Sequence, residues 1–189
     1  MIPRYSREKI SYIWSDENMY NTWLKVEIAT CEAWNELGII PDKDLEKIKL
    51  VKFDMKKYDK YFDETKHDIV SFVRSISENL GEESRWIHHG ITSNDVKDTA
   101  LSLQLIESID HIDTEINKLM ESIKIKAINE ISTPIMGRSH GMHAEPMSFG
   151  AKLGIFWDEL SRHTERFNQS KKRASTCMIS GPVGSLSLI

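Results

Sequence analysis

The sequence SNDVKDTALSLQLIESIDHIDTEINKLMESIKIKAINE, residues 93–130, decides the fold. It contains neither proline nor glycine, the residues that most disfavour the interior of a helix. Apolar side chains recur in it at steps of three or four residues, the spacing of one helix face. They are Val96, Ala100, Leu103, Ile106, Ile109, Ile112, Ile116, Leu119, Ile123 and Ala127. The pattern predicts one nearly unbroken helix from Asn94 to Glu130, about 55 Å long, which is typical of an elongated helical bundle.

Shorter helices are predicted before this stretch. Ser15 is a typical N-cap, and the apolar helix face that follows it ends where Gly38 permits a left-handed turn. A short helix should follow Asp42, and another should run from Ile69 to Leu80 and end at Gly81. These elements indicate a small domain made of helices.

A second long helix is predicted from near Pro146 to Lys172, again from apolar residues at helical spacing. Between the long helices, residues 132–145 are rich in glycine and histidine and are expected to be irregular. Strands should be few, at Thr133–Met136 and in the last residues of the chain. The expected fold class is all-α: a small N-terminal helical domain, residues 1–92, followed by the first long helices of an elongated helical bundle, residues 93–189.

The composition is that of an ordinary globular protein. The chain has 189 residues, a net charge of −4, 40% hydrophobic residues and 29% charged residues, which excludes disorder. No apolar run reaches the ~18 residues of a membrane span, and the charged N-terminus lacks the apolar core of a signal peptide. Cys31 and Cys177 lie far apart in sequence and indicate a reducing compartment. A cytoplasmic protein is therefore predicted, with neither membranes nor nucleic acids as partners.

The histidines are unevenly distributed along the chain. Five of them fall at helix starts or in the segments between helices: His67, His88, His89, His140 and His143. Joining segments carry function more often than core positions do, and in a bundle they meet at the ends of the helices. These imidazoles are therefore candidates for a shared site.

The most unusual segment is Gly137–Pro146, GRSHGMHAEP. One interpretation is that His140 acts as a general acid or base at the start of the second long helix. The other is a polar loop whose histidine and glutamate side chains satisfy backbone groups. His140 and His143 could also ligate a metal, but no third ligand has a recognisable spacing, so no metal is expected.

The segment Trp86–Asp95 ends at the start of the longest helix. Thr92 and Ser93 contribute two hydroxyl groups there, beside main-chain N–H groups that have no partner within the helix. Such a helix end could bind an anion. Ser93, followed by Asn94 and Asp95, could equally serve only as the N-cap of the helix.

Two short motifs could contact a phosphate group. Arg4 and Tyr5 offer a charged fork and a hydroxyl group, and Lys66-His67-Asp68 stands at a helix start. The alternatives are a solvated arginine near the N-terminus and an aspartate that only caps a helix.

These segments occur together along essentially the whole chain. They are Met1–Arg7, Ile13–Asn18, Cys31–Trp34, Lys66–Val70, Trp86–Val96, Gly137–Pro146 and Ile179–Gly184. In their order and spacing they resemble the N-terminal part of the adenylosuccinate lyases, a family of the fumarase/aspartase superfamily. The resemblance implies an all-α homotetramer that needs no cofactor. It also implies the elimination of fumarate from adenylosuccinate to give AMP, and from the succinylated carboxamide intermediate of purine synthesis.

The resemblance implies roles for individual residues. His140 matches the general acid that protonates the departing nitrogen, and His67 matches the histidine near the phosphate that assists it. The residues that match substrate-binding positions are Arg4 and Tyr5 at the phosphate, Lys66 and Asp68 beside His67, Thr92 and Ser93 at the succinyl part, and His88. Departures from the family pattern occur at Lys66, His89, Ser139 and Pro182.

The superfamily's signature loop, Gly-Ser-Ser-x-Met-Pro-x-Lys-x-Asn-Pro, does not occur in the sequence. In the family this loop carries the serine that removes the carbon-bound proton. The chain is therefore expected to be an N-terminal portion that holds the acid without the base and is inactive by itself. Two other interpretations stay open. One is a superfamily lyase that acts on argininosuccinate, aspartate or carboxymuconate, and the other is a non-catalytic helical oligomerisation module.

Overall fold

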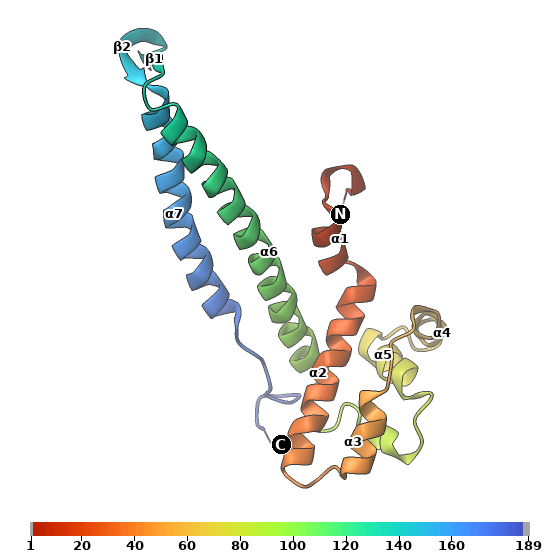
Figure 1. Ribbon diagram of the computed structural model, residues 1–189. Helices are drawn as coiled ribbons and strands as arrows, with labels where there is room; N and C mark the ends of the chain where they lie inside the picture. Colours follow the sequence, from red (N-terminus) through yellow and green to blue (C-terminus); the bar gives the residue numbers. More distant parts are fainter. Residues whose placement is uncertain (1, 187–189) are drawn as a thin grey trace. The chain divides into compact units, whose positions relative to one another are not determined.

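Most of the chain is helical in the computed structural model, which describes residues 2–186 (Figure 1). The chain forms two compact units: residues up to Leu105 together with those from Ser175, and Ile106–Ala174. The elements of the first unit are η1 (Pro3–Tyr5), α1 (Glu8–Ile13), α2 (Asp16–Glu36), α3 (Asp42–Lys49), α4 (Met55–Thr65), α5 (Asp68–Ser77), η2 (Glu82–Trp86) and the beginning of α6 (Ser93–Asn129). The predicted all-α class is confirmed.

The boundaries of α2 follow from its capping residues. The side chain of Ser15 accepts the main-chain N–H of Asn18 at 3.2 Å, as predicted for the start of this helix. The helix ends just before Gly38, whose φ of 74° lies in the left-handed region that glycine adopts without strain. Both ends of α2 were thus predictable from local sequence.

The predicted end of α5 is wrong by a few residues. The helix stops at Ser77. The N–H of Leu80 donates a hydrogen bond to the Ser77 carbonyl at 2.9 Å, which closes a turn after the helix. Gly81 has a φ of −88° and precedes η2 instead of ending α5.

The core of the first unit is formed mainly by α2, α3, α5 and the beginning of α6. At its centre the rings of Trp23 and Phe72 meet edge to face with their centroids 5.5 Å apart. Such a pair contributes about 0.5–1.5 kcal/mol beyond the burial of its area. Leu45 and Ile48 of α3, the short helix predicted after Asp42, are buried against this cluster.

In the second unit the rest of α6 is connected to α7 (Phe149–Ala174) through two antiparallel strands, β1 (Pro134–Ser139) and β2 (Met142–Ser148). The two helices run side by side below the strands (Figure 1). The prediction of one nearly unbroken long helix is confirmed, since α6 continues without interruption from Ser93 to Asn129.

The segment between the long helices is a β-hairpin. The strand expected at Thr133–Met136 is confirmed in part by β1, whereas the irregular structure expected for the rest of residues 132–145 is wrong. His140 and Gly141 form the turn of the hairpin, with φ values of 53° and 74°. Two central residues with positive φ fit the type I′ turn, whose twist matches that of paired strands. Because Pro146 belongs to β2, α7 begins at Phe149 rather than near Pro146.

Next to the hairpin, α6 and α7 approach each other closely at Gly150. A Cβ atom on Gly150 would lie 2.3 Å from the carbonyl oxygen of Ala127, so no larger residue fits without a shift of backbone. The N–H of Gly150 donates to the carbonyl of Glu130 at 3.0 Å. Farther along the pair, Lys171 forms an ion pair with Asp110.

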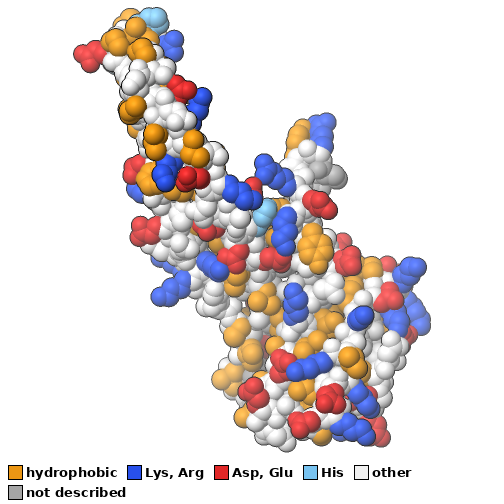
Figure 2. Space-filling model, viewed as in Figure 1, with side chains coloured by type: hydrophobic (Ala, Val, Ile, Leu, Met, Phe, Trp, Pro, Cys, Tyr) orange, Lys and Arg blue, Asp and Glu red, His pale blue; other side chains and the backbone are white. Residues whose placement is uncertain are grey.

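Large apolar side chains are exposed along both long helices (Figure 2). They include Leu119, Ile125 and Ile128 on α6, and Ile155, Phe156 and Trp157 on α7. An exposed apolar surface of this kind is typical of a region that contacts another protein surface.

Three expectations concern the chain as a whole. Within residues 2–186, no helix is both long enough and apolar enough to cross a membrane. The strand expected in the last residues is not formed between Ser175 and Leu186, and residues 187–189 lie outside the described residues. The domain boundary between residues 92 and 93 stays a prediction.

Candidate functional site

The predicted site residues occupy several places in the two units. In the first unit, Arg4 and Tyr5 lie in η1, Lys66, His67 and Asp68 at the junction of α4 and α5, His88 after η2, and Thr92 and Ser93 at the start of α6. In the second unit, His140 lies in the turn of the hairpin.

Arg4 and Tyr5 contact each other. The Arg4 guanidinium donates a hydrogen bond of 2.5 Å to the Tyr5 hydroxyl and lies 4.7 Å from the centroid of its ring. Both side chains are exposed. The pair presents a positive charge beside a hydroxyl group, a combination that suits a phosphate.

Lys66 and His67 form the junction between α4 and α5. Lys66 ends α4 in the left-handed conformation, with φ of 49°, and its ammonium group pairs with Asp63 at 3.0 Å. His67 caps α5, because its Nδ1 accepts the N–H of Val70 at 3.4 Å. In the neutral ring, acceptance at Nδ1 places the proton on Nε2, which can then donate to a ligand. In the protonated ring, Nδ1–H faces Oδ1 of Asp68 at 3.5 Å instead.

Asp68 is held by Lys97 of α6. Its Oδ1 accepts the N–H of Ile69 at 2.7 Å, and its Oδ2 pairs with the Lys97 ammonium at 2.5 Å. Burial alone would raise the pKa of Asp68, but Lys97 and the N–H of Ile69 together lower this pKa below its ordinary value. Both members of the pair line a cavity of about 360 Å³.

His88 is held by the carboxylate of Glu27, a residue of α2. Glu27 is fully buried, with 0% of its side chain exposed. Its Oε2 accepts the main-chain N–H of His88 at 2.8 Å, and its Oε1 lies 2.7 Å from the ring Nδ1. These two contacts fix both the backbone and the ring of His88.

The start of α6 is organised by Asp95, which is 1% exposed. Its Oδ2 accepts the N–H groups of Thr92 at 2.9 Å and Gly181 at 3.1 Å, and its Oδ1 accepts the N–H of Ser180 at 2.9 Å. Because α6 begins at Ser93, the capping position is Thr92 and not Ser93 as predicted.

These contacts border a cavity of about 520 Å³, which Thr92, Ser93 and Asn94 line on one side and residues between Met178 and Gly184 on the other. The first N–H groups of a helix have no partner within that helix, and they face a ligand bound at its N-terminus. With two hydroxyl groups beside them, the cavity suits a carboxylate or a phosphate.

The backbone singles out three of the predicted residues. Among residues 2–186, the non-glycine residues with positive φ are Lys66, His88, His140 and Leu186. This conformation costs about 1–3 kcal/mol for such residues, and residues of this kind cluster at functional sites. Lys66 also serves as the C-cap of α4, and His140 as a turn residue of the hairpin. The coincidence with Lys66, His88 and His140 therefore favours a functional role for these positions.

His140 is exposed in the hairpin turn, as are the neighbouring Arg138, His143 and Glu145. Within the described part of the chain, its ring takes part in no hydrogen bond or ion pair, so both ring nitrogens are open to a ligand. No group of three or more His, Cys, Asp or Glu side chains among residues 2–186 is arranged to hold a metal ion.

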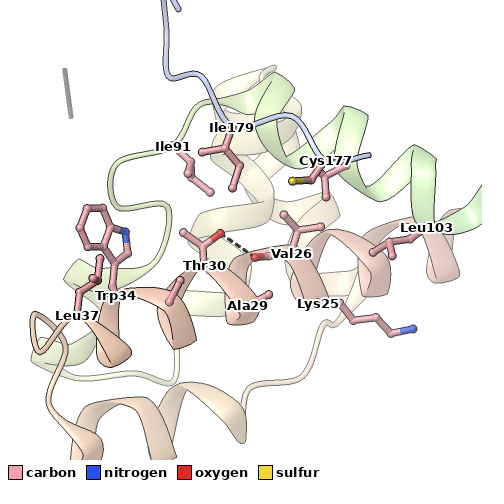
Figure 3. A pocket seen from close by; sticks show the side chains of 12 residues that line it. Lys25, Val26, Ala29, Thr30, Trp34, Leu37, Ile91, Leu103, Cys177 and Ile179 are labelled. Atoms are coloured by element: carbon pink, nitrogen blue, oxygen red, sulfur yellow. Dashed lines mark hydrogen bonds between the residues drawn. The ribbon is translucent and has the colours of Figure 1, made fainter. Parts of the chain in front are cut away.

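The first unit also has an apolar groove of about 360 Å³ (Figure 3). Ala29 and Trp34 of α2 and Leu37, its C-cap, line it on one side, and Cys177 and Ile179 on another. Ala29 and Leu37 are exposed at this groove. Its lining is mostly apolar, and Lys25 contributes a charged group. None of the predicted site residues lines this groove.

The sequence model of one protein family, described as a lyase, matches residues 4–187. The chain belongs to this lyase family. The adenylosuccinate lyase of Bacillus subtilis (strain 168) is 46% identical to it over 185 residues, which are 97% of this chain and 43% of that relative. The adenylosuccinate lyase of Staphylococcus saprophyticus is 44% identical over 190 residues, 100% of this chain and 44% of that relative. The chain thus spans less than half the length of these curated relatives.

Solved structures share the fold of this lyase chain. A fumarate lyase from Mesorhizobium sp. BNC1 has a TM-score of 0.88 and 26% identity, and the match covers 97% of this chain and 45% of that one. The 3-carboxy-cis,cis-muconate lactonizing enzyme from Pseudomonas putida has the same TM-score and identity, with 97% and 44% covered. The membership of the fumarase/aspartase superfamily that the sequence predicted is confirmed.

Three charged residues that hold the predicted site residues in place were not themselves predicted: Glu27, Asp95 and Lys97. Glu27 follows the buried Trp23 by one helical turn, and a carboxylate on a buried face needs partners, which is a usable signal. Asp95 stands three residues after Thr92, the spacing of a capping box. Lys97 has no comparable signal in the sequence.

Proposed function

We propose that the full-length protein containing this chain is an adenylosuccinate lyase. It eliminates fumarate from adenylosuccinate to give AMP, and it acts likewise on the succinylated carboxamide intermediate of purine synthesis. The observation that carries this proposal is the 46% identity to the adenylosuccinate lyase of Bacillus subtilis over 97% of this chain. The solved fumarate lyase and muconate-lactonizing enzyme are only 26% identical over the same share.

The charges of the first unit fit such a substrate, which carries a phosphate and two carboxylates. Arg4 with Tyr5, and Lys66 with the Nε2–H of His67, are the groups we assign to the phosphate. Thr92, Ser93 and the N-terminus of α6 are those we assign to the carboxylates of the succinyl part. We place Asp68 and His88 in the same binding region, as the family resemblance implies.

The elimination breaks a carbon–nitrogen bond, so the departing nitrogen has to gain a proton while the neighbouring carbon loses one. We assign the first transfer to His140 as general acid, with His67 assisting it from the phosphate side. The exposed, unpaired ring of His140 supports this assignment. The signature loop is absent from these 189 residues, so we assign the base to residues outside them.

We propose further that the full-length protein is a homotetramer in the cytoplasm. The exposed apolar side chains along α6 and α7 support self-association, because such a surface is stabilised by a covering partner. Cys31 and Cys177 are both free thiols, which fits a reducing compartment.

A second candidate is a lyase of the superfamily with another substrate. The TM-score of 0.88 to the muconate-lactonizing enzyme favours it, since the same fold supports that chemistry. A shared fold alone does not determine the substrate. Sequence identity over the whole matched segment also includes the residues of the candidate site, so it is the stronger argument for the substrate.

The deciding experiment incubates the full-length protein separately with adenylosuccinate, argininosuccinate, aspartate and carboxymuconate. We expect AMP and fumarate from adenylosuccinate, and no turnover of the other three. Turnover of one of the others, with adenylosuccinate untouched, would overturn the proposal. The 189-residue chain alone should be inactive, and activity in that sample would contradict a base located outside it. A full-length protein that self-associates without any of these activities would point to an oligomerisation module.

A further inference from the structure

Glu27 is a carboxylic acid inside the core of the first unit. It lies on α2 with Trp23 one turn before it and Cys31 one turn after it, and all three side chains are buried. A carboxylate removed from water costs several kcal/mol unless hydrogen-bond donors surround it. Donors are therefore required at this point in the core.

The donors that the structure provides both come from His88. The main-chain N–H lies 2.8 Å from Oε2, and the ring Nδ1 lies 2.7 Å from Oε1. Since a carboxylate only accepts hydrogen bonds, Nδ1 has to carry a proton in this contact. The other ring nitrogen, Nε2, forms no hydrogen bond with any residue in 2–186, and 22% of the side chain is exposed.

We propose that Glu27 is a positioning residue for His88. It fixes the ring and keeps the proton on Nδ1, so that Nε2 is the nitrogen His88 offers to the substrate, as an acceptor in the neutral ring. The inference rests on the proposed function, in which His88 belongs to the active site. The contact to the main-chain N–H also supports the left-handed backbone of His88, whose φ is 62°.

A comparison with His67 shows what this positioning does. The Nδ1 of His67 accepts a hydrogen bond from Val70, which leaves Nε2–H of the neutral ring as a donor. The Nδ1 of His88 donates to Glu27, which leaves Nε2 as an acceptor. The two histidines therefore present opposite hydrogen-bonding characters, and Glu27 is the residue that makes His88 differ.

Glu27→Gln tests this role with little change in size. If the amide oxygen accepts the main-chain N–H of His88, the amide NH₂ faces Nδ1. This group only donates hydrogen bonds, so it requires an Nδ1 that carries no proton. The ring proton then moves to Nε2, which becomes a donor. Glu32→Gln is the matched control, because Glu32 lies on the same helix and pairs with Lys49 at 2.6 Å, partly exposed.

In the full-length protein we expect E27Q to lower kcat/KM by roughly tenfold or more and E32Q to change it by less than about twofold. A double-mutant cycle separates positioning from general stabilisation. In a His88→Ala background, E27Q should cost less than about twofold, because the residue it positions is gone. A loss in that background equal to the loss in the wild type overturns the proposal, and so does unchanged kcat/KM in E27Q.

A second readout needs no substrate, so it tests the inference even if adenylosuccinate is not cleaved. The lone pair of an unprotonated ring nitrogen attacks a carbonyl carbon of diethylpyrocarbonate, which transfers a carbethoxy group to the ring and releases ethanol and CO₂. Peptide mass spectrometry follows the adduct on His88. We expect modification at Nε2 in the wild type and in E32Q, and modification slowed about fivefold or more in E27Q. Equal rates in wild type and E27Q, or an unreactive His88 in the wild type, overturn the proposal.

His88→Asn keeps the inference falsifiable if E27Q does not fold. The amide nitrogen of asparagine can take the place of Nδ1 against Glu27, and asparagine tolerates the left-handed backbone, but nothing replaces Nε2. We expect a melting temperature close to that of the wild type and a kcat/KM reduced by about tenfold or more. Full activity in H88N contradicts a role for Nε2.

Discussion

The carboxylate of Asp95 accepts the main-chain N–H of Gly181 at 3.1 Å, across 86 residues of sequence. The same carboxylate accepts the N–H groups of Ser180 and Thr92. One buried side chain therefore holds the start of α6 and the segment around Gly181 in contact, and both border the cavity that we assign to the succinyl part. The shape of that cavity depends on Asp95 although the residue does not line it.

Asp95→Ala should destabilise the first unit by about 3 kcal/mol, because it leaves buried N–H groups without an acceptor. Asp98→Ala is the matched control, because Asp98 is an aspartate of the same helix at an exposed position. It should change the stability by less than about 0.5 kcal/mol. Chemical denaturation of the chain, followed by circular dichroism, measures both. Equal stability of the two variants would mean that the N–H groups find other acceptors.

Two glycines of α7 should respond in opposite directions to the same substitution. Gly150→Ala places a Cβ 2.3 Å from the carbonyl oxygen of Ala127 and 2.7 Å from the Cα of Ile131, so α6 and α7 must move apart at some cost in stability. Gly154 has nothing within 4 Å of such a Cβ, and Gly154→Ala should stabilise the helix by up to about 1 kcal/mol. Thermal unfolding of both variants of the chain checks the difference in sign. A stabilised G150A would show that the helices do not pack as described.

The ion pair of Asp68 and Lys97 predicts a pH dependence of stability. The pKa of Asp68 is lower in the folded state than its ordinary value of about 3.9, so the pair contributes stability above that pH. The contribution is lost as the pH falls through the lowered pKa of the folded state. Because both side chains are partly exposed, the effect is modest.

Denaturation of the chain between pH 6 and about pH 2 measures this effect. Asp68→Asn and Lys97→Met should each flatten the decrease in the free energy of unfolding at the acidic end. Asp59→Asn, at an exposed position of α4, should retain the wild-type decrease. A wild-type slope in D68N would assign the acid sensitivity to other carboxylates.

The elements predicted correctly are those that depend on local sequence. The helix α6 was predicted from a run without proline or glycine that has apolar residues at helical spacing. The boundaries of α2 were predicted from Ser15 at its start and Gly38 after its end. The hairpin was predicted only in part, through the strand expected at Thr133–Met136, because its strands, PIMGRS and MHAEPMS, are poor in β-branched residues. Two local signals were not used: Gly141 at the turn, and the alternation of apolar and polar residues in MHAEP.

The contacts of the candidate site are mostly long-range. Glu27 and His88 are 61 residues apart, and Asp95 and Gly181 are 86 residues apart. A periodicity describes which face of one helix is buried, but it does not say which residue of another segment reaches that face. His88 and Thr92 could therefore be predicted from their residue types. The carboxylates that hold them, those of Glu27 and Asp95, became evident only from the structure.

The assignment of the general acid to His140 predicts a difference between two histidines of one hairpin. His140→Asn removes the imidazole, and asparagine before glycine is the most favourable pair for a type I′ turn, so the hairpin should persist. In the full-length protein H140N should lower kcat by roughly a hundredfold or more and change KM little, because the proton is needed only as the bond breaks. His143→Asn makes the same change at an exposed position of β2 and should leave kcat within a few-fold of the wild type. Loss of turnover in H143N with near-normal H140N would place the acid on the other ring. Full activity in both variants would make the hairpin purely structural and the proposed elimination mechanism wrong.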